Sequence, residues 1–283
     1  MSELENSANS QKGLAKLLEV FRDSFLGIIK PSQLEKIALA QASAASIAST
    51  SAFKTTLKQN LANEISQMTH SAREARQFYN IANIYAHAAQ EIQMIGHIND
   101  TPVSSEWSAR FFDYAQDICE EEAQIIWGKI LTEEVANPGK FFKRTLSILR
   151  NIEPFEAKWF VDICPFVLQN CFILSYIVIQ NHYPANQFQS LIDCGLINSI
   201  NCGFTLNENT MEIHGKTQSI KFILPQTGYM PQINMGNVYV LTDAGSQLYK
   251  ITLCQTDQAY LIRLKEHIER TYNIESEFIQ ASQ

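Results

Sequence analysis

The stretch from Trp107 to Trp159 constrains the fold of this chain most strongly, because it combines helical periodicity with specific turn residues. It holds all three tryptophans, and its apolar residues between 120 and 135 recur every three or four positions, as on one helix face. Pro138 and Gly139 then end that helix, since proline cannot continue the hydrogen-bond ladder. The pattern predicts four short helices joined by tight turns, with core anchors at Trp107, Trp127 and Trp159.

A signature surrounds the Pro-Gly turn: WGKILTEEVANPGKFFKRTLSILRNIEPFEAKWF, at residues 127–160. It resembles the central signature of a bacterial family known as domain of unknown function number 2806. In that family a tryptophan helix, an acidic pair, a Pro-Gly turn and an acidic restart follow one another. The opening segment GLAKLLEVFRDSFLGIIKPSQLEKIALAQA, at residues 13–42, is also similar to that family. The resemblance implies a bacterial protein in mobile or phage-related gene neighbourhoods, and it implies no particular activity.

The 283 residues, 46% of them hydrophobic and 18% charged, have room for two globular domains and an ample core. No apolar run approaches the roughly 20 residues that a membrane-spanning helix needs. The first ten residues lack the basic head of a signal peptide, so we expect a cytoplasmic protein. The net charge of -7 argues against strong nonspecific binding to phosphate groups, which requires a basic surface.

Lys12 to Lys30 is predicted to be an amphipathic helix, preceded by a flexible tail at 1–11. Two roles are open for its apolar face: packing on the protein's own bundle, or docking on a membrane surface or a partner. Mixed charges on its polar face weaken the membrane alternative. The predicted interaction surface joins this face to the seam of the next long helix: Leu14, Leu17, Leu18, Phe21, Phe25, Leu61, Ile65 and Met68.

Residues 53–95 have the periodicity of one long helix, or of two helices with a slight break. Apolar residues keep a four-three spacing from Leu61 onward, which is a coiled-coil seam, and a second apolar stripe runs from Phe78 to Ile95. A helix that is apolar on two sides needs a partner for one of them, so we expect a homo-oligomer. The residues that follow, 96–104, are rich in turn formers.

After residue 170 the pattern changes from helices to a mixture of helices and strands. Residues 172–179 fit either a buried strand or the end of a buried helix. The last predicted helix is 257–272. Short alternating segments predict strands at 204–206, 211–214 and 220–224.

Two segments in this part together resemble the wing region of a winged helix. They are LIDCGLI at 191–197 and YVLTDAGSQL at 239–248. In that fold a helix ends at the glycine, here Gly195, and a short hairpin follows. A new helix then begins at the threonine, here Thr242, which is a natural N-cap residue.

The predicted fold class is therefore mainly α: an elongated N-terminal helical region and a helical bundle, with a smaller α+β, winged-helix-like C-terminal module. The predicted segments are a flexible tail (1–11), an amphipathic and long helical region (12–104), a compact helical core module (105–170) and an α+β winged-helix-like module (171–283).

No established catalytic motif occurs in the sequence. Pro138-Gly139-Lys140 lacks the upstream glycine and the following Ser or Thr of a phosphate-binding loop. His87 and Glu91 lie four residues apart and could form an acid-base or metal set with Glu133 and Glu134, but such residues are more often solvated or ion-paired. We predict no catalytic residue, no cofactor and no metal site.

The cysteines do not form a metal or redox motif, because none are spaced as C-x-x-C and the histidines do not cluster with them. Without an export signal we expect reduced and mostly buried thiols. The six are Cys119, Cys164, Cys171, Cys194, Cys202 and Cys254.

The function favoured by these observations is that of a non-enzymatic bacterial cytoplasmic interaction or regulatory protein with a protein partner. The family resemblance links it to phage defence or prophage biology. One alternative is a DNA-binding transcriptional regulator acting through the C-terminal module, which the lack of Lys and Arg at 187–194 disfavours. The other is a membrane-acting effector that uses the N-terminal amphipathic helix.

Overall fold

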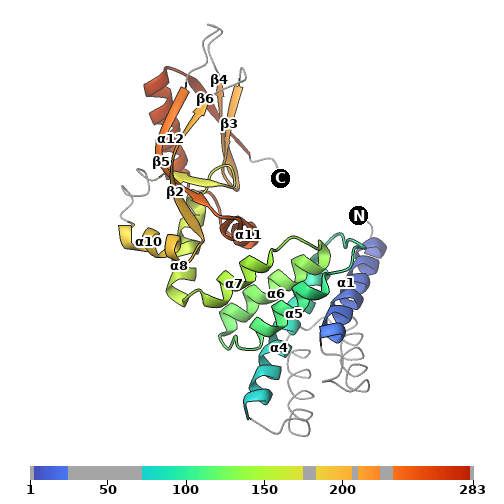
Figure 1. Ribbon diagram of the computed structural model, residues 1–283. Helices are drawn as coiled ribbons and strands as arrows, with labels where there is room; N and C mark the ends of the chain where they lie inside the picture. Colours follow the sequence, from blue (N-terminus) through green and yellow to red (C-terminus); the bar gives the residue numbers. More distant parts are fainter. Residues whose placement is uncertain (1–2, 25–71, 175–182, 206–209, 224–231, 281–283) are drawn as a thin grey trace. The chain divides into compact units, whose positions relative to one another are not determined.

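The computed structural model describes residues 3–24, 72–174, 183–205, 210–223 and 232–280 (Figure 1). The chain is mainly α, with a smaller α+β part, as predicted. It divides into two compact units, unit 1 (Met1–Arg150) and unit 2 (Asn151–Gln283). This boundary falls inside the predicted 105–170 module, and the three predicted segments after the tail stay a prediction.

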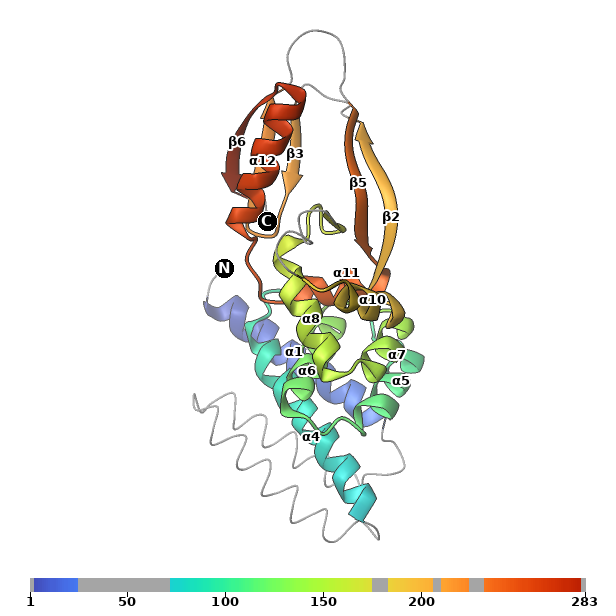
Figure 2. The same ribbon diagram turned by 90° about the vertical axis from the view of Figure 1, so that its left-hand side faces the viewer.

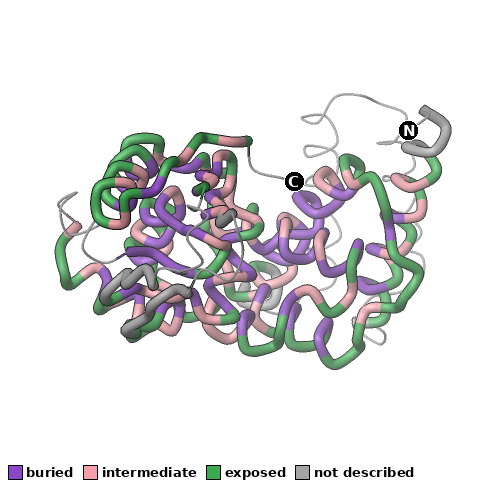
Figure 3. The backbone as a smooth tube through the Cα atoms, turned by 90° about the horizontal axis from the view of Figure 1, so that it is seen from above, coloured by how far each residue is buried: buried purple, intermediate pink, exposed green. Residues whose placement is uncertain are grey.

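The described part of unit 1 is helical. Its elements are α1 (Glu3–Ser24), α4 (Ala72–Glu91), the 3-10 turn η1 (Ile92–Met94), α5 (Ser105–Ala115), α6 (Glu121–Ala136) and α7 (Lys143–Asn151). Helix α6 packs against α4 and α1. Its Trp127 is 1% exposed, and the ring lies 5.2 Å from that of Phe111 in α5, centroid to centroid. Buried stretches alternate with exposed ones along these helices, as their apolar spacing requires (Figure 3).

Helices α4 and α6 approach each other closely at Gly128. A Cβ atom at this position would lie 2.6 Å from Cβ of His87 and 3.1 Å from the backbone nitrogen of Ala88. One turn further along α6, the hydroxyl of Thr132 donates a hydrogen bond to the backbone carbonyl of Ala88 at 3.0 Å. Glycine at 128 therefore permits a backbone contact between the two helices that a larger residue would prevent.

Helix α1 packs inside unit 1, against η1, α5 and α6. Leu14, Leu17 and Phe21 of the predicted interaction surface are buried, so these three do not form an exposed surface, and Leu18 is half-buried. The ammonium group of Lys16 also donates to the backbone carbonyls of Asn99 and Thr101, at 2.8 and 2.6 Å. Of the two roles predicted for this face, internal packing is the one observed. The remaining residues of that surface lie outside the described residues: Phe25, Leu61, Ile65 and Met68.

The predicted flexible tail is also corrected, because α1 begins at Glu3 and residues 3–11 are helical. Asn9 in this segment donates from its side-chain amide to the backbone carbonyl of Gly96 at 2.7 Å. None of the helices among the described residues is both long enough and apolar enough to cross a lipid bilayer.

The four helices predicted between Trp107 and Trp159 are present as α5, α6, α7 and α8 (Pro154–Ile163). Trp107 is buried at 3% exposure, and its ring stacks on Phe111 at 5.1 Å. Trp159 is only half-buried, against the edge of the exposed Phe155 ring at 4.8 Å. The predicted anchor at 159 is therefore less enclosed than the other two, because it lies at the margin of its helix face.

Unit 2 combines helices with two antiparallel sheets, ordered β1-β5-β2 and β3-β4-β6. Helix α12 packs on β4 and β6 and runs along their sheet (Figure 2). The described elements of unit 2 that follow α8 are the 3-10 turn η2 (Cys164–Phe166), β1 (Phe172–Leu174), α10 (Ala185–Asp193), β2 (Ile197–Thr205), β3 (Thr210–His214), β4 (Gln218–Ile223), β5 (Gln232–Leu241), α11 (Asp243–Ile251), α12 (Gln258–Tyr272) and β6 (Glu275–Gln280).

A single threonine joins α10, β2 and α11. The hydroxyl of Thr242 donates to the backbone carbonyl of Gly195 at 2.7 Å and accepts the backbone N–H of Gly245 at 3.1 Å. Gly195 has φ of 82°, which ends α10, and Ile197 then pairs with Leu241 across β2 and β5. The predicted helix end at Gly195 and the predicted N-cap at Thr242 are thus confirmed. The hairpin is not short, because both strands are long and β3 and β4 lie between them in the chain.

One strand of unit 2 was not predicted, and the prediction of mostly buried thiols is wrong. Strand β6, which follows α12 and pairs with β4, was not predicted, and the strand alternative for 172–179 holds over Phe172–Leu174. Of the five cysteines whose surroundings the structure describes, Cys164 alone is buried, so the thiols are not mostly buried.

Candidate functional site

The Pro-Gly turn between α6 and α7 is held by the side chain of Glu134. One carboxylate oxygen accepts the backbone N–H of Gly139 at 2.6 Å, and the other accepts that of Phe141 at 2.9 Å. Gly139 has φ of 89°, a conformation that glycine adopts without strain. Glu134 is 1% exposed, and burial raises the pKa of its carboxyl, although the backbone N–H groups oppose this shift. The acidic half of the signature therefore supplies the hydrogen-bond partners of its own turn.

The residues considered for acid-base or metal chemistry have other surroundings. His87 is buried where α4 meets α6, Glu133 forms an ion pair with Lys140 at 2.5 Å, and Glu134 is occupied in the turn. Among the residues that the structure describes, no group of three or more His, Cys, Asp or Glu side chains could hold a metal ion. The signature residues are thus accounted for by packing and turn formation.

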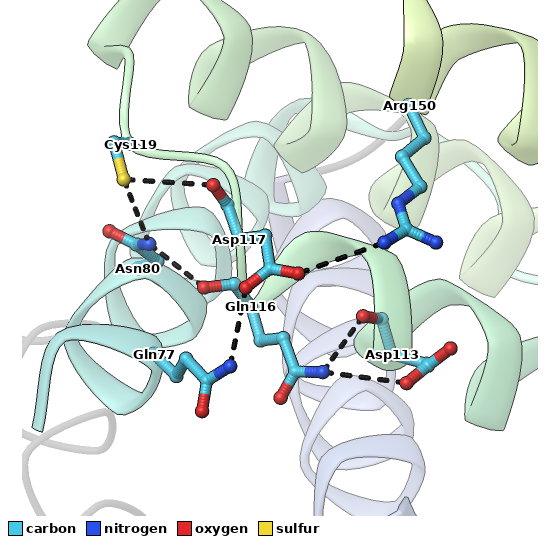
Figure 4. Close-up of polar contacts among 7 residues, drawn as sticks. All are labelled: Gln77, Asn80, Asp113, Gln116, Asp117, Cys119 and Arg150. Carbon is cyan, nitrogen blue, oxygen red and sulfur yellow. Dashed lines mark hydrogen bonds and ion pairs between the residues drawn. The ribbon is translucent and has the colours of Figure 1, made fainter. Parts of the chain in front are cut away.

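A polar cluster surrounds the turn between α5 and α6 (Figure 4). One carboxylate oxygen of Asp117 accepts the side-chain amide of Gln77 at 3.2 Å, and the other lies 3.8 Å from Nη2 of Arg150. The guanidinium of Arg150 also lies over the ring of Tyr114, 4.8 Å from its centroid. Helices α4, α5 and α7 are tied together through this turn.

The inner side of the cluster consists of two amide side chains, each 3% exposed. Asn80 donates to the backbone carbonyl of Gln116 at 2.8 Å and to the sulfur of Cys119 at 3.4 Å. Gln124 donates to the backbone carbonyl of Ile118 at 2.8 Å. Because both amides bond to carbonyls of the turn, they satisfy groups that would be costly to leave unpaired.

The contacts of this cluster stabilise the turn between α5 and α6. The thiol of Cys119 accepts from Asn80 and donates to the backbone carbonyl of Asp117 at 3.6 Å. The ion pair of Asp117 with Arg150 is exposed, and such pairs contribute about 0–1 kcal/mol. Sequence reasoning missed this cluster, because amide side chains separated by a helix and a loop carry no motif.

Glu156 in unit 2 resembles Glu134 in unit 1, because its carboxylate also accepts a backbone N–H beside a helix end. Its Oε2 atom accepts the backbone N–H of Glu153 at 3.0 Å, which forms a capping box at the start of α8. Its Oε1 atom accepts the hydroxyl of Ser190 at 2.7 Å, which ties α8 to α10. The predicted acidic restart at 153–154 is confirmed, and its second carboxylate positions α10.

Helix α10 packs one side on the sheet and leaves the other open. Phe188 is buried and stacks on Tyr239 of β5, with 4.3 Å between ring centroids. The amide of Gln189 on the open side donates to the carboxylate of Asp193 at 2.9 Å. The helix contains no Lys or Arg. Its exposed polar side chains, called the α10 face below, are Asn186, Gln189 and Asp193.

Comparison with known families agrees with the signature. Residues 64–172 match the model of a family described as Protein of unknown function (DUF2806). The chain carries this domain. Glu134, the cluster around Asp117 and Glu156 all lie within the DUF2806 segment, whereas the α10 face follows it. No curated protein and no solved structure matches the chain.

Proposed function

We propose that this protein is a non-enzymatic bacterial interaction or regulatory protein, acting in the cytoplasm, that binds a protein partner through unit 2. The observation that carries the proposal is the α10 face, which is exposed, polar and free of cations. The five cysteines whose surroundings the structure describes are free thiols, which is compatible with a reducing compartment.

The order of elements around α10 supports a winged-helix-like reading of unit 2. Helix α8, strand β1, helix α10 and strand β2 come in this order along the chain, and β5 comes after β3 and β4. The sheet order is β1-β5-β2. In DNA-binding helix-turn-helix proteins the last helix before such strands enters the major groove. Helix α10 occupies the corresponding position in this chain.

The chemistry of α10 favours a protein over DNA as its partner. DNA binding relies on Lys and Arg to neutralise phosphates, and α10 offers only the negative charge of Asp193. Protein interfaces accept polar and nearly neutral surfaces that include some apolar contacts. Strand β2, which packs beside α10, exposes 45% of Ile200 and so offers such a contact.

Self-association through the predicted seam of the long helix is part of the proposal, although Leu61, Ile65 and Met68 lie outside the described residues. The membrane-effector alternative has less support, because Leu14 and Leu17 of α1 are buried. The link to phage defence or prophage biology rests on the family resemblance alone. Light scattering over a concentration series tests self-association, and a monomer at tens of micromolar would contradict it.

Affinity capture with the full chain as bait tests the partner surface. The variant Gln189→Lys places a cation on the α10 face, and the matched control Gln258→Lys makes the same change at an exposed position of α12. We expect Gln189→Lys to lose proteins that both the wild type and Gln258→Lys retain. Equal recovery of every protein by all three chains would refute the α10 face as the docking surface.

A further inference from the structure

The two described sheets of unit 2 have four edge strands: β1 and β2 in one sheet, β3 and β6 in the other. The outward backbone groups of an edge strand can pair with another chain, so proteins usually shorten, cover or distort such strands. Strand β1 is only three residues long, and both backbone groups of Phe172 bond to Leu168, at 2.7 and 3.0 Å. Strand β2 has a register shift between Asn201 and Gly203, and α10 packs beside it. The first sheet therefore offers no regular open edge.

The outer edge of β3 is covered by Gln169. The backbone N–H of Gln169 donates to the backbone carbonyl of His214 at 2.7 Å, and its side-chain amide donates to that of Glu212, also at 2.7 Å. These two carbonyls are two residues apart, so they lie on the same edge of the strand. Gln169 thus occupies the place that a further strand would take.

Strand β6 has no comparable cover at its outer edge. It pairs with β4 over all six of its residues, without a register shift. Helix α12 contacts it from one face of the sheet: the hydroxyl of Ser276 donates to Glu269 at 2.7 Å, and Nζ of Lys265 lies 5.9 Å from the ring centroid of Phe278. Apart from β4 and α12, nothing in the described part of the chain forms a hydrogen bond with β6, which lies at the margin of its sheet (Figure 2).

The sequence of β6, ESEFIQ, lacks the residues that most often block an edge. It contains no proline, glycine or lysine. In an antiparallel pair, alternate residues direct their backbone N–H and C=O groups away from the partner strand. Strand β6 therefore presents a regular row of donors and acceptors, called the β6 edge below, that an extended segment could complete.

The side chains of the same sheet indicate the charge of such a segment. Glu275 and Glu277 project from the sheet face away from α12, because side chains alternate along a strand and Phe278 faces that helix. In the next row positions, Glu277 lies opposite Lys221 of β4, which lies opposite Glu212 of β3. This face thus carries three glutamates and one lysine, and the two glutamates of β6 are exposed.

A second copy of the chain fits this edge poorly. Pairing of β6 with β6 would bring the carboxylates of Glu275 and Glu277 close to their own counterparts, and like charges on neighbouring strands destabilise a sheet. A strand with cations at alternate positions gains opposite-charge pairs instead. The charge pattern therefore favours a basic segment of another protein.

We propose that the β6 edge binds an extended segment of a partner protein in which Lys or Arg recurs at every second position, adding a strand to the β3-β4-β6 sheet. Its cations lie opposite Glu275 and Glu277, and its alternate, apolar side chains lie beside Phe278. Backbone hydrogen bonds supply affinity, and the carboxylates select the sequence. This site is independent of the α10 face, because it shares no residue with it.

A synthetic peptide of alternating Val and Lys, as long as β6 and blocked at both ends, tests the proposal by titration calorimetry with the full chain. We expect binding that weakens as salt is added, because exposed charge pairs are screened. The control peptide of alternating Val and Glu has the same spacing and the opposite charge, and it should not bind. No heat with the Val-Lys peptide, or equal affinity for both peptides, would overturn the proposal.

N-methylated peptides show whether a strand is added. Alternate residues of an added strand direct their N–H groups toward β6. Methylating the backbone nitrogens of the valines removes one alternate set of donors, and methylating those of the lysines removes the other, while both peptides keep their charge. One peptide should lose binding and the other should retain it. Equal behaviour of the two would contradict strand addition.

Charge reversals in the protein locate the binding site. Glu277→Lys should weaken binding of the Val-Lys peptide about 5-fold, because an opposite-charge pair becomes a like-charge pair. The matched control Glu266→Lys makes the same change at an exposed position of α12 and should change the affinity by less than about 2-fold. Equal effects of the two would mean that only net charge matters. Gln189→Lys on the α10 face should leave peptide binding unchanged, so failure of either surface is recognised separately.

Hydrogen exchange of the peptide complex supplies an internal control. Amides of β6 (Glu275–Gln280) should exchange more slowly in the complex, because their outward groups become paired. Amides of β3 (Thr210–His214) should not change, because Gln169 already covers that edge. Slowing at β3 and not at β6 would place the peptide elsewhere and refute the β6 edge as its site.

Discussion

The α6–α7 turn of unit 1 and the α11–α12 connection of unit 2 are both held by side-chain contacts, but with opposite consequences for reactivity. In the first, Glu134 is buried and both of its oxygens accept backbone N–H groups. In the second, Cys254 is partly exposed, and its sulfur lies 3.7 Å from the hydroxyl of Thr252, which the ammonium group of Lys216 also contacts. A titratable group whose bonding capacity is taken up by the backbone is part of the scaffold, whereas one left open to solvent is available for chemistry or binding.

The same contrast separates the helices. Trp127 of α6 is enclosed by its own unit, and α10 presents a polar face to solvent. Unit 1 therefore supplies a braced core, and the surfaces we consider functional belong to unit 2. The predictions below test that division, starting with the largest expected effect.

Trp127→Ala should lower the free energy of unfolding by ~3–5 kcal/mol, because a buried aromatic leaves a cavity. That loss is a large part of the ~5–15 kcal/mol that stabilises a typical protein. The control Trp159→Ala truncates a half-buried ring and should cost less. Thermal melts of both variants provide the measurement. An unchanged melting temperature for Trp127→Ala would mean that the tryptophan lines a binding site and does not support the core.

Glu134→Gln should cost about 1–3 kcal/mol, since an amide has one acceptor oxygen where the turn uses two. The control Glu133→Gln removes only the partly exposed ion pair with Lys140 and should cost ~0–1 kcal/mol. Urea unfolding of both variants measures the difference. Equal costs would mean that the turn does not depend on the buried carboxylate.

The pH dependence of Glu134→Gln has a definite sign. Burial raises the folded pKa of Glu134 above its unfolded value, so the folded state binds the proton more tightly. This stability is fully present below the unfolded pKa of about 4.3 and is lost as the pH rises through the folded pKa. The unfolding free energy of wild type relative to Glu134→Gln should therefore fall as the pH rises from about 4.3 through the folded pKa. A rise over that interval would show that the two backbone N–H bonds outweigh burial.

Local features were predictable, because their causes lie within a few residues. Pro138 and Gly139 mark the end of α6, and Pro154 marks the start of α8, as the sequence predicted. Asp257, the first residue of the last predicted helix, is the N-cap of α12. Thr242 was recognisable as an N-cap by its residue type and its position before a helical pattern.

Features that depend on distant partners were not predictable in the same way. Strand β6 exists because Phe278 pairs with Ile220, and nothing near either residue indicates the other. The sequence predicted the apolar stripe of α1, but it did not predict that η1, α5 and α6 cover this stripe. The hydrogen bond from the backbone N–H of Asp257 to the carbonyl of Pro165 likewise depends on how η2 meets the α11–α12 connection, which no local spacing reveals.

Binding of the full chain to duplex DNA tests the central claim, that unit 2 presents a protein-docking surface, most directly. Mobility shifts over a range of salt concentrations should show no complex tighter than the weak, nonspecific range of about 10⁻⁴–10⁻⁶ M, because α10 has no cation. Tight binding that weakens steeply with added salt would contradict the account and identify the C-terminal module as a DNA reader.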